Sequence, residues 1–123
     1  MKKDIIELRI PSKLDYISVA RLTSSAICCN MGLNIDDIED IKVSIGEACI
    51  NSLNKSEELE IKFNIEEDRL SIRINNVSPC KDDEIDINKE IELGILIIKS
   101  LMDEVNFDEK GVEMIKYIED GNR

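Results

Sequence analysis

Residues 41–52 read Ile41-Lys42-Val43-Ser44-Ile45-Gly46-Glu47-Ala48-Cys49-Ile50-Asn51-Ser52. The apolar and small side chains in this stretch recur every three or four residues, which is the period of a helix face packed on a sheet. Glu47 and Asn51 stand four residues apart and therefore share a second, polar face, which Lys55 continues. The stretch predicts an amphipathic helix whose polar side is available for chemistry.

Upstream of this helix the chain carries the signals of a helix start. Asp37 follows Asn34 by three residues, which is typical of an N-cap, and further acidic residues suit the positive end of a helix dipole. We therefore expect the helix to begin after Asn34 and to run to about Lys55.

The first part of the chain predicts a strand followed by another helix. Isoleucine and leucine alternate with charged residues over 4–10, the period of a strand with one solvated face. Ser12 and Asp15 resemble a capping box, and apolar residues then recur at helical spacing up to Gly32. This first helix carries apolar side chains on more than one face, including Leu22, which favours self-association.

Downstream, alternating residues at 59–65 and 70–76 predict a β-hairpin. Residues 77–89 contain Pro79 and an acidic cluster, so we expect an irregular loop there. A third helix over 90–103 and a final hairpin of 105–107 with 112–118 complete the chain.

This order of elements predicts an α+β fold in which helices cover one face of a sheet. Most of the strands are linked as hairpins, so the expected two-layer sandwich has a mixed, mainly antiparallel sheet. With 123 residues and a mass of 14.0 kDa, the chain is expected to form one domain over residues 1–123.

Composition narrows the classes of partner and of chemistry. The net charge is −11, from 16 basic and 27 acidic residues, so phosphate-rich nucleic acids and anionic membranes would repel the chain. The sequence contains no histidine, which excludes His-dependent triads and a phosphohistidine acceptor in this chain. A general base must therefore be a carboxylate or a lysine.

The cysteines and the N-terminus indicate the cytoplasm. None of the four cysteines is spaced as C-x-x-C, and Cys28 and Cys49 fall among apolar residues of expected helices, where a free thiol packs as a small hydrophobe. Residues 1–4 lead directly into the first strand, with no apolar segment of a signal peptide.

The Glu47–Asn51 pair has two interpretations. A carboxamide oxygen can ligate Mg²⁺, and a carboxylate one turn away can orient or deprotonate a hydroxyl that attacks a phosphate. The same spacing also occurs on the solvated face of an ordinary amphipathic helix. The chemical interpretation predicts that Glu47, Asn51 and Lys55 lie in a concave site facing the 77–89 loop.

Two blocks of sequence resemble a known family. Residues 41–52 are similar to the N-box helix of the bacterial anti-sigma-factor serine kinases, which belong to the GHKL (Bergerat-fold) ATPases. Residues 93–105, Leu93-Gly94-Ile95-Leu96-Ile97-Ile98-Lys99-Ser100-Leu101-Met102-Asp103-Glu104-Val105, resemble the helix after the ATP lid of that family. The order of elements agrees too, so the resemblance spans nearly the whole chain and implies the histidine-kinase-like ATPase fold.

The resemblance assigns roles to individual positions. Glu47 matches the catalytic carboxylate, Asn51 the Mg²⁺-chelating asparagine and Gly94 the second glycine of the lid. Other nucleotide-binding positions depart from the family pattern. The adenine-binding D-x-G-x-G motif aligns with Asn76, Ser78 and Cys80, the first lid glycine is Glu92, and the histidine after the chelating asparagine is Lys55.

By resemblance, the chain is expected to bind a sigma factor and to be switched by an anti-anti-sigma protein, as a homodimer. With Mg²⁺ and ATP as cofactors, it would phosphorylate a serine of that partner. The altered pocket positions favour a nucleotide-free protein-interaction module on the same scaffold, whereas the intact Glu47 and Asn51 oppose it. The sequence is also compatible with a detached histidine-kinase ATP-binding domain and with an unrelated α+β domain.

Overall fold

The computed structural model describes residues 3–79 and 85–118. Its strands and helices follow the order β1 (Lys3–Pro11), η1 (Leu14–Tyr16), α1 (Ile17–Met31), α2 (Ile35–Ser52), β2 (Glu58–Glu66), β3 (Arg69–Asn75), α3 (Ile85–Leu101), β4 (Glu104–Phe107) and β5 (Gly111–Tyr117). The strands form one five-stranded sheet in the order β1-β2-β3-β5-β4.

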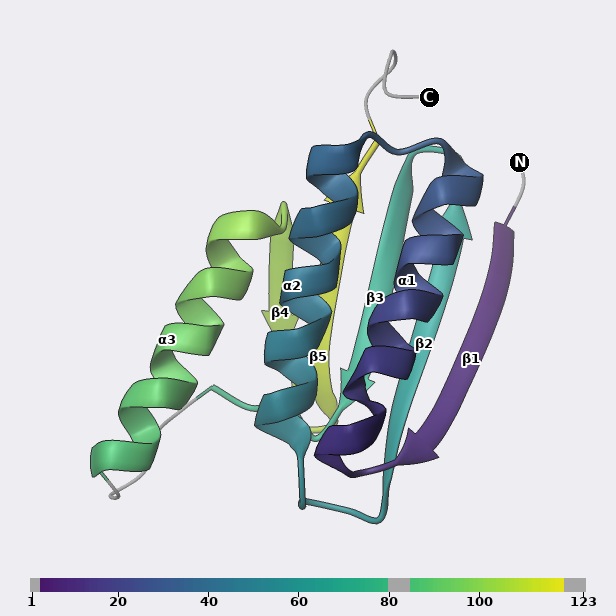
Figure 1. Cartoon of the computed structure of the whole chain (residues 1–123). Helices are drawn as coiled ribbons and strands as arrows, with labels where there is room; N and C mark the ends of the chain where they lie inside the picture. The colour runs from purple at the N-terminus through teal and green to yellow at the C-terminus, as the bar shows by residue number, and fades with distance from the viewer. Residues whose placement is uncertain (1–2, 80–84, 119–123) are drawn as a thin grey trace.

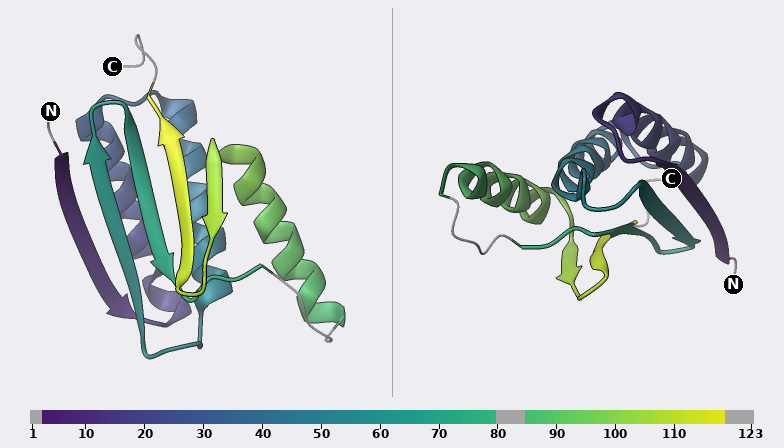
Figure 2. Two further views of the ribbon diagram at one scale, coloured as in Figure 1. Left: turned by 180° about the vertical axis from the view of Figure 1, so that it is seen from behind. Right: turned by 90° about the horizontal axis from the view of Figure 1, so that it is seen from below.

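The helices form a second layer on one face of this sheet (Figure 1 and Figure 2). Helices α1 and α2 lie side by side over the strands, and α3 packs beside α2 near β4. The expected two-layer α+β fold is confirmed. The four strand pairings of the described sheet are all antiparallel, so the mixed sheet that we expected has no parallel pair in this region.

The core lies between the two layers. In β2 and β3 every second residue points toward the helices, as the alternating sequence predicts, and Phe63 and Ile72 are completely buried there. Helix α2 buries its apolar stripe against them. Cys28 and Cys49 are buried free thiols, and burial raises the pKa of each to about 12, so both remain neutral core residues.

The predicted cap of α2 is confirmed, whereas that of α1 is wrong. The side chain of Asn34 accepts a hydrogen bond from the Asp37 N–H at 2.8 Å, and Gly32 ends α1 with a left-handed φ of 80°. Ser12 does not cap a helix. Its hydroxyl accepts a hydrogen bond from the Asn54 N–H at 3.1 Å, because the end of β1 lies against the turn that follows α2.

Two helix boundaries also differ from the prediction. Helix α2 ends at Ser52 instead of near Lys55, since Leu53 leaves the helical conformation with a ψ of 140° and Asn54 follows with a left-handed φ of 66°. Helix α3 begins at Ile85, so residues 85–89 of the expected 77–89 loop are helical.

A buried lysine joins the two layers. Lys116 on β5 is only 6% exposed, and its ammonium donates to the carbonyl oxygen of Leu101 at 2.5 Å, at the end of α3. The same ammonium lies 3.9 Å from Asp37 and 3.7 Å from Asp40 at the start of α2. One side chain thus ties β5 to the ends of two helices.

Candidate functional site

Asn51 lies in the last turn of α2 and fastens this helix to the segment that leaves β3. The residue is 8% exposed; Nδ2 donates to the Ser78 carbonyl at 3.0 Å, and Oδ1 accepts from the Ser78 N–H at 3.1 Å. The carboxamide therefore pairs with both main-chain groups of Ser78. These bonds confirm that Asn51 faces the segment after β3.

Lys55 completes this cluster. Its ammonium donates to Asn51 Oδ1 at 3.1 Å and to the Ser78 hydroxyl at 3.2 Å. Partial burial lowers the pKa of Lys55 from its ordinary value. We refer to Asn51, Lys55 and Ser78 together as the amide cluster.

A hollow of about 470 Å³ lies beside the amide cluster. It opens where β3 ends and the β4–β5 hairpin turns, and it is lined by Lys55, Asn76, Val77, Ser78, Pro79, Phe107, Asp108, Glu109, Lys110 and Gly111. Three residues assigned by resemblance, Lys55, Asn76 and Ser78, therefore share one wall. Asn76 has a left-handed φ of 62°, and its Nδ2 donates to the Ser56 hydroxyl at 2.9 Å.

Glu47 lies one turn before Asn51 on α2, against α3. Gly94 of α3 is buried there, and a Cβ added to it would lie 2.8 Å from Glu47 Oε1. The glycine thus allows α3 to approach the carboxylate closely. Glu47 itself lines a hollow of about 400 Å³ between α1 and α2, together with Arg21 and Ile50. Within residues 3–79 and 85–118, Glu47 and Lys55 thus line two different hollows. The single concave site stays a prediction, because the loop that it would face includes residues 80–84, outside the described residues.

Two further positions of the altered nucleotide motif are Glu92 and Cys80. Glu92 is exposed on α3, whereas Cys80 lies outside the described residues. Sequence reasoning missed the β4–β5 hairpin as a wall of the hollow. The pairing of Asn75 with Gly111 brings this hairpin to the end of β3, and no local pattern in either segment indicates that register.

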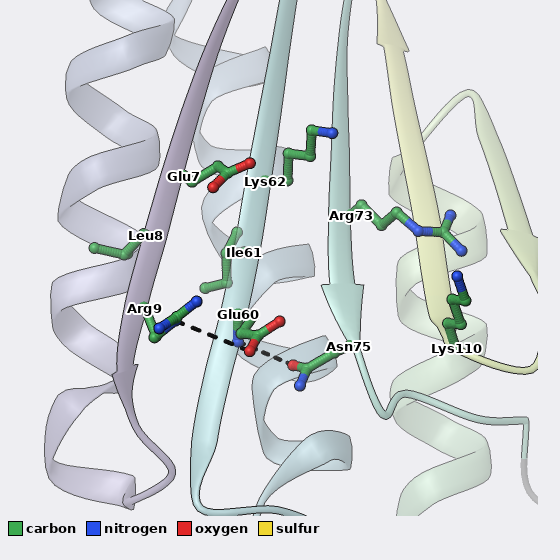
Figure 3. Close-up of a pocket in the computed structure, with 9 residues that line it drawn as sticks. All are labelled: Glu7, Leu8, Arg9, Glu60, Ile61, Lys62, Arg73, Asn75 and Lys110. Carbon is green, nitrogen blue, oxygen red and sulfur yellow. Dashed lines mark hydrogen bonds and ion pairs between the residues drawn. The ribbon is translucent and has the colours of Figure 1, made fainter.

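Another hollow of about 470 Å³ lies on the outer face of the sheet (Figure 3). Strands β1, β2 and β3 contribute most of its lining, and the charged side chains there pair across strands, as Arg9 does with Glu58 and Glu60. It contains none of the residues that the sequence assigned to the nucleotide site. We therefore place the candidate site on the helical side.

The donor set of the candidate site suits a phosphate better than a metal ion in this arrangement. Lys55 presents an ammonium to the hollow, and the main chain and hydroxyl of Ser78 lie beside it. A divalent metal would need Asn51 Oδ1, which already accepts two hydrogen bonds. Elsewhere in residues 3–79 and 85–118, no group of three or more acidic or cysteine side chains could hold a metal ion.

Comparison with known proteins agrees with this fold. The histidine kinase-like ATPase domain family matches residues 10–116. The serine-protein kinase RsbW of Staphylococcus aureus, in strains JH9, Newman and USA300, is 36% identical over an alignment of 141 residues. That alignment covers 95% of this chain and 89% of the relative. The chain therefore belongs to the histidine kinase-like ATPase domain family, among the proteins similar to RsbW.

Proposed function

We propose that this protein is an anti-sigma regulator that binds a sigma factor and is switched by an anti-anti-sigma protein, whose serine it phosphorylates with ATP. The observation that carries the proposal is the pair of Glu47 and Asn51 one turn apart on α2, with Gly94 of α3 packed against the carboxylate. Membership of the family of serine-protein kinases similar to RsbW supports the reaction type.

The described residues would have separate roles in binding the nucleotide and in transferring its phosphoryl group. Lys55 and Ser78 would bind the phosphates, and Asn76 would accept from the adenine amino group. Asn51, which the resemblance assigns to Mg²⁺, would hold Lys55 and Ser78 in place. ATP supplies the phosphoryl group. The partner's serine oxygen bonds to the γ-phosphorus while the bond to the β-phosphate oxygen breaks and ADP leaves, and Glu47 accepts the hydroxyl proton.

Strand β1 and helix α1 offer the surface for partners and for a homodimer. β1 is an edge strand, paired only with β2 in the described sheet, so its outer backbone groups can pair with another chain. Exposed apolar side chains lie along these elements at Ile5, Ile6, Val19 and Leu22.

A sigma factor works with RNA polymerase, so this function implies the cytoplasm. No helix among the described residues is long and apolar enough to cross a membrane.

The second candidate function is a nucleotide-free interaction module. It is favoured by the amide cluster, in which Asn51 is already engaged by protein groups, and by the exposed carboxylate of Glu92 where the family has a glycine. Such a protein would bind its sigma factor without consuming ATP. A histidine-kinase role has less support, because the chain contains no phosphoacceptor histidine.

Two measurements test the proposal. The purified protein is mixed with sigma factors and anti-anti-sigma proteins from the same genome; gel filtration detects complexes, and radiolabelled ATP detects serine phosphorylation. Glu47→Gln should lower the transfer rate by about 10²- to 10⁴-fold. Glu39→Gln, an exposed change two turns earlier on α2, should leave it unchanged. Sigma binding without transfer would favour the interaction module, and absence of sigma binding would refute both.

A further inference from the structure

The oxygen that the family uses for a metal ion already contacts a cation in this chain. A carboxamide oxygen has two lone pairs. In Asn51 one accepts the Ser78 N–H and the other accepts the Lys55 ammonium, both at 3.1 Å. The amide cluster therefore saturates Asn51 Oδ1 with protein donors.

Mg²⁺ and Lys55 cannot occupy this oxygen together. Mg²⁺ binds oxygen at about 2.0–2.1 Å and demands near-octahedral geometry, and an ammonium on the same oxygen would repel it strongly. The Lys55 ammonium is also held by the Ser78 hydroxyl, which the segment after β3 supplies. A metal ion would have to displace both contacts of the lysine.

Lys55 can also supply the positive charge that a metal ion would bring to the phosphates of a ligand. An ammonium has three donors, and two of them contact Asn51 and Ser78, which leaves one to face a ligand in the hollow. Lys110 lines the same hollow and adds a second positive charge. Of the two carboxylates on its wall, that of Asp108 is paired with Arg73.

We infer that Lys55 is the resident cation of the nucleotide site: it takes the place of the divalent metal on Asn51 and binds the phosphates of a nucleotide without Mg²⁺. This inference rests on the nucleotide site of the proposed function. Lys55 would then help to determine whether the site binds the metal-free or the metal-bound form of the nucleotide.

The test is a calorimetric titration of the purified protein with ATP, in excess Mg²⁺ and in EDTA. The wild-type affinity should differ by less than about threefold between the two conditions. Lys55→Met should weaken binding in EDTA by about 10- to 100-fold, the usual effect of losing one charged hydrogen bond, and Mg²⁺ should restore much of it. Lys62→Met, on the outer face of β2, is the charge-matched control and should behave as wild type.

A second measurement needs no nucleotide. The side-chain amide resonance of Asn51 should shift in Lys55→Met and stay in place in Lys62→Met, provided that the two variants melt as the wild type does. Wild-type binding that requires Mg²⁺, or an unchanged affinity of Lys55→Met in EDTA, overturns the inference and leaves the proposed function intact. Absence of ATP binding in both conditions also overturns it, whereas the sigma-binding assay then decides the proposed function separately.

Discussion

Gly111 should be the glycine whose replacement damages this fold most. It is the first residue of β5 and pairs with Asn75 of β3. A Cβ added at Gly111 would lie 2.1 Å from the backbone oxygen of Ile74 and 3.0 Å from the Cα of Asn75. Both atoms belong to the backbone of a central strand, so no side-chain rotation can relieve the overlap. Gly111→Ala therefore forces β3 and β5 apart.

The size of the effect follows from what must move. Overpacking in a tightly packed region costs about 1–3 kcal/mol. Separation of the strand ends also weakens neighbouring hydrogen bonds, such as that from the Asn76 N–H to the Lys110 carbonyl at 2.8 Å, each contributing about 0.5–1.5 kcal/mol. We expect a total loss of about 3–5 kcal/mol. For a chain of 123 residues this corresponds to a fall in Tm of about 10–20 °C.

Urea and thermal unfolding followed by circular dichroism provide the measurement. Gly46→Ala is the matched control, since a Cβ there would lie 3.6 Å from Arg21 Cδ, an ordinary contact, within a helix that gains about 1 kcal/mol from alanine. Gly46→Ala should therefore leave the free energy of unfolding unchanged or raise it slightly. If Gly111→Ala loses less than about 1 kcal/mol, the close approach of β5 to β3 is not as described and the reasoning is refuted.

Three further substitutions each test one other contact of the structure. Gly94→Ala should keep the unfolding free energy within about 1 kcal/mol of wild type, because the tip of Glu47 can move, while the proposed phosphoryl transfer falls by up to about 10²-fold in the radiolabel assay. Lys116→Met should cost about 1–3 kcal/mol in urea unfolding, and a loss under about 0.5 kcal/mol would contradict its bridging role. Asn34→Ala should cost about 1 kcal/mol by removing the cap of α2, compared with no loss for exposed Asn106→Ala.

The sequence predicted correctly those features that depend only on residues near one another in the chain. The alternation in 59–65 and 70–76 marks the hairpin of β2 and β3, because each of these strands buries one face. The Asn34 cap needs only an N–H three residues away. Ser12 failed by the same criterion, since its hydroxyl bonds Asn54, 42 residues further along the chain. A cap is predictable only where no distant donor competes for the side chain.

The same difference between local and long-range contacts explains which parts of the candidate site could be predicted from the sequence. Asn51 and Lys55 are four residues apart, so their contact follows from spacing even though Lys55 lies beyond the end of α2. The contact of Asn51 with the backbone of Ser78 spans 27 residues and does not depend on the identity of that side chain. Sequence therefore identified the amide but could not show that its oxygen is already engaged.

The antiparallel order of the sheet connects the stability of the fold with the shape of the site. Since β3 runs antiparallel to β5, the end of β3 lies beside the start of β5, where Asn75 pairs with Gly111. That register carries the Asn76 N–H to the Lys110 carbonyl, and Asn76, Lys110 and Gly111 all line the hollow. The segment then continues directly to Ser78 in the amide cluster. Only glycine permits the close approach at position 111, so we expect a substitution there to displace the hairpin wall of the hollow and thereby to alter the site.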